Sequence, residues 1–258
     1  AVSTMEASYD VASMCKTSTK VFVLEVMGRH AGWIAAAGAM ASTDEHEIPI
    51  VVLFPEVKFN QKKFLKAVND KVKKFGYCSV VVSEGVAWPD GRFLAETGLK
   101  DAFGHSQLGG AAPVVAEMIQ AKLGHKYHWA VADYLQRAAR HIASKSDVEQ
   151  AYATGKAAVE YAIKGHNSVM PAIKRTSNKP YRWKIEMAPL SKVANVEKMM
   201  PKSFISKDGF GITKRCRDYL EPLIRGEEYP AYNKNGLPKY VQLKKVMVAK
   251  KCPDFKLK

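Results

Sequence analysis

The chain has 258 residues, of which 47% are hydrophobic and 25% charged, and its formal net charge is +15. This composition is ordinary for a globular protein, and no apolar run approaches the ~20 residues that a membrane-spanning helix needs. The 4 cysteines lie far apart and form no CxxC pair, which argues against a disulfide framework and against a zinc cluster. We therefore expect a cytoplasmic protein with reduced thiols and no membrane partner.

The chain alternates between apolar, β-branched runs and helical patterns. Buried strands are predicted, in chain order, at residues 20–26, 48–54, 78–82 and 127–132. Helices are predicted at residues 7–18, 33–42, 64–75, 108–123 and 212–220. Gly76 is expected to close the third of these helices, because glycine readily adopts the left-handed conformation found there. Residues 86–104 show no regular pattern and are expected to be irregular.

The second half of the chain continues with less regular signals. Ser146 to Glu149 reads as a capping box, which predicts a helix that runs to about Gly165. Short strands are predicted at residues 169–174 and 183–187, and a polar tail follows. Strands that alternate with helices predict an α/β fold in three layers, with a mostly parallel, doubly wound sheet. Ligands of such sheets bind beyond the carboxyl ends of the strands.

Polar side chains follow three of the predicted strands. The residues concerned are Met27, Gly28 and Arg29, then Ser83, Glu84 and Gly85, then Asp133, Tyr134 and Arg137. A guanidinium suits phosphate because its planar fork donates two hydrogen bonds, and a carboxylate accepts hydrogen bonds from sugar hydroxyls. Each residue also has a local structural interpretation, since Glu84 can cap the next segment and Arg137 can pair with Asp133. Together at successive strand ends they predict a site for a phosphorylated, hydroxylated molecule.

The segment EVMGRHAGW, which begins at Glu25, closely resembles the fructose 6-phosphate loop of the phosphofructokinase family. The segments PEVKF, from Pro55, and VVVSEG, from Val80, follow in the family's order. YLQRAARH, from Tyr134, and the HAGW continuation are similar to the pyrophosphate-dependent branch. The resemblance extends from the first residue to about Ile224.

The resemblance implies transfer of a phosphoryl group from pyrophosphate, with Mg²⁺, to O1 of fructose 6-phosphate. The substrate-binding residues that it implies are Met27, Gly28, Arg29, Glu84, Tyr134, Arg137 and Lys20. The first three would lie against the sugar phosphate, Glu84 would accept from sugar hydroxyls, and Tyr134 with Arg137 would bind the 6-phosphate end. Lys20, and less clearly His128, stand where relatives carry an arginine that reaches a neighbouring subunit's substrate. A homo-oligomer is therefore expected.

The chain also departs from the family pattern. A full member carries a GGDD-type loop for the donor and metal and a TIDND-type segment with the base, and neither string occurs here. We expect the Mg²⁺ ligands and the base in an N-terminal half that this sequence lacks, and hence no catalytic residue and no turnover by this chain alone. Residues 1–225 are expected to form the region that carries the sugar site, with residues 226–258 as a C-terminal extension.

Other functions remain open from the sequence. The chain could be a non-catalytic sugar-phosphate-binding or regulatory subunit, or belong to an ATP-dependent phosphofructokinase. The excess of lysine is spread over the chain without a nucleic-acid-binding motif, so a solvated basic face is favoured and no nucleic-acid partner is expected.

Overall fold

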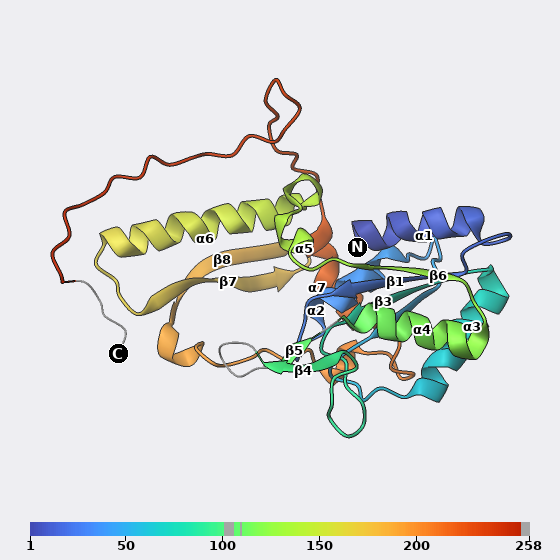
Figure 1. Cartoon of the computed structure of the whole chain (residues 1–258). Coiled ribbons are helices and arrows are strands. Elements are labelled where there is room, and N and C mark those ends of the chain that lie inside the picture. Colours follow the sequence, from blue (N-terminus) through green and yellow to red (C-terminus); the bar gives the residue numbers. More distant parts are fainter. Residues whose placement is uncertain (101–105, 109, 254–258) are drawn as a thin grey trace.

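The computed structural model describes residues 1–100, 106–108 and 110–253. Within these residues the body is a four-stranded parallel sheet with helices on both faces, and a long helix with a two-stranded hairpin projects from it (Figure 1). The predicted α/β fold with a parallel central sheet is confirmed. No helix among the described residues is both long enough and apolar enough to cross a bilayer.

The sheet follows the four predicted apolar runs. Its strands are β1 (Val21–Val26), β2 (Ile50–Leu53), β3 (Cys78–Ser83) and β6 (Tyr127–Val131). They lie in the order β2-β3-β1-β6, and Val23 of β1 is opposite Val80 of β3 and Trp129 of β6. β2 and β3 are buried along their whole length, because helices cover both faces, and this explains why their sequences are apolar without alternation.

Helices separate into two layers. α3 (Gln61–Phe75) and α4 (Ala111–Leu123) cover one face, where Phe64 and Ile119 pack with Val80. On the other face lie α1 (Val2–Met14), α2 (Trp33–Gly38) and α7 (Lys214–Leu220). The three-layer arrangement is visible in Figure 1.

Helix α3 shows how local signals set its ends. The Asn60 side chain accepts a hydrogen bond from the Lys63 N–H at 3.0 Å, which caps the start of the helix. Gly76 closes it with a φ of 86°, as predicted. Phe64, Val68 and Val72 form its buried face.

The projecting arm consists of α6 (Lys145–Ile163) packed on the antiparallel strands β7 (Val169–Asn178) and β8 (Tyr181–Pro189). Both strands are longer than predicted. The predicted capping box is wrong, because Ser144 caps α6 by accepting from the Asp147 N–H at 3.1 Å. The Ser146 hydroxyl instead donates to the Pro222 carbonyl at 2.8 Å, which ties the helix to the body.

Residues 86–104 were expected to be irregular, and this is wrong in part for residues 86–100, whereas residues 101–104 lie outside the described residues. They contain strand β4 (Glu96–Lys100), which pairs antiparallel with β5 (Ser106–Leu108). The helix expected from Leu108 therefore begins only at Ala111. The remaining elements are α5 (Leu135–Ala138) and the 3₁₀ turns η1 (Ala39–Ala41), η2 (Arg140–Ile142), η3 (Leu190–Lys192), η4 (Lys202–Phe204) and η5 (Glu221–Ile224).

Candidate functional site

The topology of the sheet predicts a ligand-binding position between the carboxyl ends of β1 and β3, which is called the crevice below. α2, which follows β1, packs on one face of the sheet, and α4, which lies beyond β3 in the chain, packs on the other. β1 and β3 are neighbours, with Val26 opposite Ser83 at their carboxyl ends. In open α/β sheets, ligands bind where the connections of two adjacent strands diverge in this way. The residues that directly follow β1 and β3 therefore form the candidate site.

Hydrogen bonds continue the pairing of the two strands into their loops. The Val26 carbonyl accepts from the Glu84 N–H at 3.0 Å, and the Gly28 carbonyl accepts from the Gly85 N–H at 3.2 Å. The Ser83 hydroxyl also donates to the Gly28 carbonyl, at 2.6 Å. The two loops thus form one unit whose geometry is fixed by the sheet below it.

Two glycines allow this close approach. Gly28 has a φ of 140°, and a Cβ there would lie 2.6 Å from both the Ala31 carbonyl oxygen and the Ser83 hydroxyl. A Cβ on Gly85 would lie only 1.6 Å from the Arg29 carbonyl oxygen. Side chains at these positions would force the loops apart, so the sequence needs glycine at both.

The carboxylate of Glu84 completes the contact between the loops. Its Oε1 accepts a hydrogen bond from the Gly28 N–H at 3.1 Å. Arg29 is half-buried, and its main chain lies against Gly85. The structure therefore brings together Gly28, Arg29 and Glu84, three of the predicted site residues.

The segment after β6 reaches the same edge of the sheet. The Met27 N–H donates to Gln136 Oε1 at 3.3 Å, and Gln136 Nε2 donates to the Asp133 carbonyl at 2.9 Å. Gln136 thus links the β1 loop to the third strand end. The sequence analysis missed this residue, because a glutamine on a short helix carries no functional signal without its neighbours in space.

Tyr134 and Arg137 form a stacked pair on this segment. The Arg137 guanidinium carbon lies 4.4 Å from the centre of the Tyr134 ring, and both side chains are exposed. A cation over an aromatic face is held in place without using its N–H groups. Arg137 is exposed, so its N–H groups are accessible to a phosphate from solution.

A buried carboxylate lies beneath the three loops. Glu25 is 5% exposed, and its Oε2 accepts from the Ala112 N–H, in the first turn of α4, at 2.8 Å. Burial raises the pKa of Glu25, and the charges of Glu84 and Asp133 raise it further, while the hydrogen bonds from α4 act in the opposite direction.

The sequence of the chain matches a known protein family. The family description "Phosphofructokinase" matches residues 1–162, which is more than half of the chain.

The chain belongs to the phosphofructokinase family.

Close relatives of this phosphofructokinase chain share one description. "Pyrophosphate--fructose 6-phosphate 1-phosphotransferase" of Methylococcus capsulatus is 66% identical over 251 residues, which cover 97% of this chain and 60% of the relative. The protein of that description from Halomonas elongata is 62% identical over 257 residues, which cover 100% of this chain and 61% of the relative. The chain thus spans about 60% of the length of these relatives.

The crystal structure of a pyrophosphate-dependent phosphofructokinase from Nitrosospira multiformis is similar in fold. It superimposes with a TM-score of 0.87 at 66% identity, over 99% of this chain and 60% of that chain. The corresponding structure from Marinobacter aquaeolei gives a TM-score of 0.85 at 56% identity, over 99% of this chain and 61% of that chain.

In this member of the family, the segment before η4 also borders the β1 loop. His30 Nδ1 lies 2.8 Å from a carboxylate oxygen of Glu197, and Trp33 Nε1 donates to the Lys198 carbonyl at 2.7 Å. Glu56 joins the same two segments, because its Oε1 accepts from the Gly32 N–H at 3.0 Å and from the Met200 N–H at 3.1 Å. This wall of the site was not predicted, since 167 positions of sequence separate His30 from Glu197.

Lys20 lies apart from the other predicted residues. It precedes β1, whereas Met27 follows it, so about 20 Å of strand separates the two at ~3.3 Å per residue. Lys20 Nζ donates to the Cys15 carbonyl. Within one chain, Lys20 therefore does not join the crevice.

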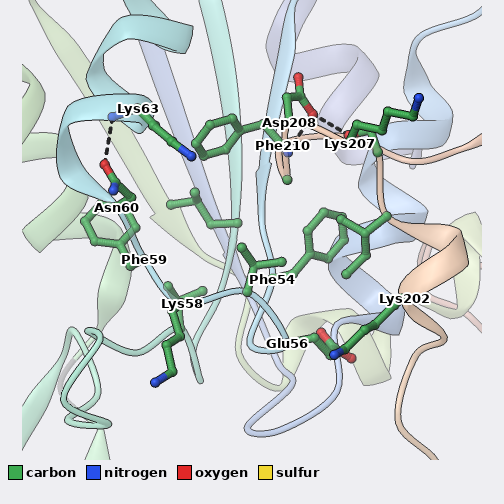
Figure 2. A pocket seen from close by; sticks show the side chains of 16 residues that line it. Phe54, Glu56, Lys58, Phe59, Asn60, Lys63, Lys202, Lys207, Asp208 and Phe210 are labelled. Atoms are coloured by element: carbon green, nitrogen blue, oxygen red, sulfur yellow. Dashed lines mark hydrogen bonds between the residues drawn. The ribbon is translucent and has the colours of Figure 1, made fainter.

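A cavity of about 650 Å³ lies elsewhere, beyond the end of β2. Figure 2 shows its aromatic residues Phe54, Phe59 and Phe210, and its labelled lysines, which point in different directions. The cavity contains none of the predicted substrate-binding residues. Among the residues that the structure describes, no group of three His, Cys, Asp or Glu side chains lies close enough to hold a metal ion.

Proposed function

We propose that this chain supplies the fructose 6-phosphate site of an enzyme that transfers a phosphoryl group from pyrophosphate to O1 of the sugar, giving fructose 1,6-bisphosphate. The observation that carries the proposal is the Glu84–Gly28 hydrogen bond of 3.1 Å, at which the loops after β1 and β3 meet beside Arg29. Relatives that are 57–66% identical carry the name of this activity, which supports the assignment of donor and acceptor.

The proposed roles follow from the chemistry of each side chain. Met27, Gly28 and Arg29 lie against the sugar phosphate, where the bidentate fork of the arginine neutralises its charge. Glu84 accepts hydrogen bonds from sugar hydroxyls. Tyr134 and Arg137 bind the 6-phosphate, and their stacking at 4.4 Å orients the guanidinium before the ligand arrives.

Lys20 has a different proposed role. It lies at the opposite end of β1 from the crevice, a position suited to completing the site of another subunit. A homo-oligomer with sites near its subunit boundaries is therefore part of the proposal.

The chemical step requires groups that the described residues do not offer. Phosphoryl transfer depends on positioning and on neutralisation of charge by metal and cations. Among the described residues, no group of three His, Cys, Asp or Glu side chains could hold a metal ion. In this proposal the base and the ligands of Mg²⁺ are supplied by polypeptide other than these 258 residues, and the chain alone is inactive.

The proposal includes the organisation and location of the chain. Residues 1–225 carry the sugar site, and residues 226–258 act as a C-terminal extension. A glycolytic role in the cytoplasm is part of the proposal, and the free cysteines, three of which are buried, support the location.

One experiment separates this function from its alternatives. Formation of fructose 1,6-bisphosphate is followed by a coupled assay with pyrophosphate and with ATP, for this chain and for the product of the complete gene. We expect turnover with pyrophosphate by the complete product and none by the chain alone. Turnover with ATP only would place the enzyme in the ATP-dependent class. Sugar-phosphate binding without turnover by the complete product would assign the regulatory subunit.

A further inference from the structure

The position of Glu25 is unusual for a charged side chain. Val21 and Val23 point to the face of the sheet that α3 and α4 cover, and Glu25 continues this row at the end of β1 where α4 begins. It is buried as deeply as its apolar neighbours, at 5% exposure. A buried carboxylate costs stability unless hydrogen bonds compensate it, so its partners indicate its role.

One partner of Glu25 is the start of α4. The first N–H groups of a helix have no partner within the helix, and the cap residue Gly110 has no side chain that could accept from them. Glu25 supplies this acceptor from another element, at 2.8 Å from the Ala112 nitrogen. A negative charge at a helix N-terminus is also favoured by the helix dipole.

The second partner is the segment after β6. The Glu25 carbonyl accepts from the Ala132 N–H at 3.0 Å, directly before the segment that carries Tyr134 and Arg137. Met27, whose N–H is bonded to Gln136, follows two residues after Glu25. One residue thus contacts α4 through its side chain and the third strand end through its backbone.

The connection from β3 to α4 is consequently tied to β1 at both of its ends. At its start, Glu84 is held by the Gly28 N–H at 3.1 Å, and at its end, Ala112 is held by Glu25 at 2.8 Å. If the second tie is lost, the start of α4 loses its side-chain link to β1, and a side-chain bond to β1 remains only at the Glu84 end of the connection.

On the basis of the proposed function, we infer that Glu25 is a positioning residue of the sugar-phosphate site. Its carboxylate fastens the start of α4 to β1. It thereby holds the connection that carries Glu84 in the geometry that binds the ligand. Glu25 itself does not touch the substrate. This role depends on the length of the Glu25 side chain, which brings an oxygen within hydrogen-bond distance of Ala112, and its charge is secondary.

Two substitutions of Glu25 separate the effect of side-chain length from the effect of charge. Glu25→Gln keeps an oxygen at the same distance from the backbone, whereas Glu25→Asp keeps the charge but shortens the side chain by about 1.5 Å, beyond hydrogen-bond distance of Ala112. Asn60→Ala serves as the matched control, because it removes the cap of α3 without touching the crevice. The dissociation constant of fructose 6-phosphate is measured by calorimetry for each variant.

We expect Glu25→Gln and Asn60→Ala to bind within about threefold of the wild type, and Glu25→Asp to bind about tenfold more weakly or worse, as for one lost hydrogen bond. Binding by Glu25→Asp equal to the wild type, or binding by Glu25→Gln as weak as by Glu25→Asp, would overturn the role of Glu25. A wild type that does not bind fructose 6-phosphate would overturn the proposed function itself, and this inference with it.

Hydrogen exchange of the wild-type chain tests the same inference without any substitution. Because coupling between two parts of a protein is reciprocal, saturating fructose 6-phosphate should slow amide exchange in the first turn of α4 and leave the first turn of α3 unchanged. Equal exchange in α4 with and without the sugar phosphate would contradict the inference, even if Glu25→Asp fails to fold.

Discussion

Gly85→Ala tests how closely the two loops of the site must approach. The new Cβ would lie 1.6 Å from the Arg29 carbonyl oxygen, 2.3 Å from its carbonyl carbon and 2.6 Å from its Cα. All three are backbone atoms, so no side-chain rotation relieves the clash. The Arg29 peptide has to retreat by roughly 1.5–2 Å, and such overpacking costs about 1–3 kcal/mol of stability. A displacement of ~1 Å at a binding group can cost about 100-fold in function.

The assay for this variant has two readouts. Calorimetric titration with fructose 6-phosphate should show an affinity about 10- to 100-fold below the wild type, and urea unfolding should show the loss of stability. Gly155→Ala is the matched control, since no atom lies within 4 Å of its new Cβ on α6. This control should gain about 0.5–1 kcal/mol and keep its affinity. If Gly85→Ala binds the sugar phosphate as tightly as the wild type, the crevice is not the site.

Four further outcomes follow from the structure. Arg29→Lys should weaken binding of fructose 6-phosphate roughly 10- to 100-fold in calorimetry, because a point charge replaces the bidentate fork; unchanged affinity would place the phosphate elsewhere. Glu84→Gln should bind the sugar more weakly but unfold at the wild-type urea concentration, since an amide oxygen still accepts from the Gly28 loop. A thiol reagent should modify exposed Cys252 quickly and leave Cys78 unmodified in the native chain, because burial raises the pKa of Cys78 to about 12; rapid labelling of both would contradict the buried placement. Burial raises the pKa of Glu25, so the folded state holds this proton more tightly than the unfolded state. Its contribution to the free energy of unfolding is therefore fully present below the ordinary glutamate pKa and is lost as pH rises through the folded-state value, and Glu25→Gln should remove this slope from a urea-unfolding series over pH.

The regular part of the fold could be predicted from the sequence because its signals are local. The four parallel strands are unbroken apolar runs, and α3 combines a clear helical period with an asparagine at its start and a glycine at its end. The start of the long helix was predicted wrongly, because a serine two positions from the predicted cap takes its place. Ser144 precedes the long helix and caps it, whereas Ser146 lies in its first turn and donates to the Pro222 carbonyl.

The strand ends of the candidate site were also predictable, since a parallel sheet brings the carboxyl ends of its strands to one edge. The residues that support them were not. Gln136 and Glu197 act through partners that are 109 and 167 positions away in the sequence. Glu25 was visible only as part of a motif, because its function depends on the start of α4, which the sequence analysis placed three residues too early. Residues that position a site through tertiary contacts produce no periodic pattern in the sequence.

Amide NMR of the chain during titration with fructose 6-phosphate tests the central claim most directly, because it locates the ligand on the structure. The account predicts saturable shifts at Gly28, Arg29, Glu84 and Gly85, the residues of the crevice between β1 and β3. Shifts confined to the cavity around Phe59 and Phe210, or no shifts at all, would contradict it.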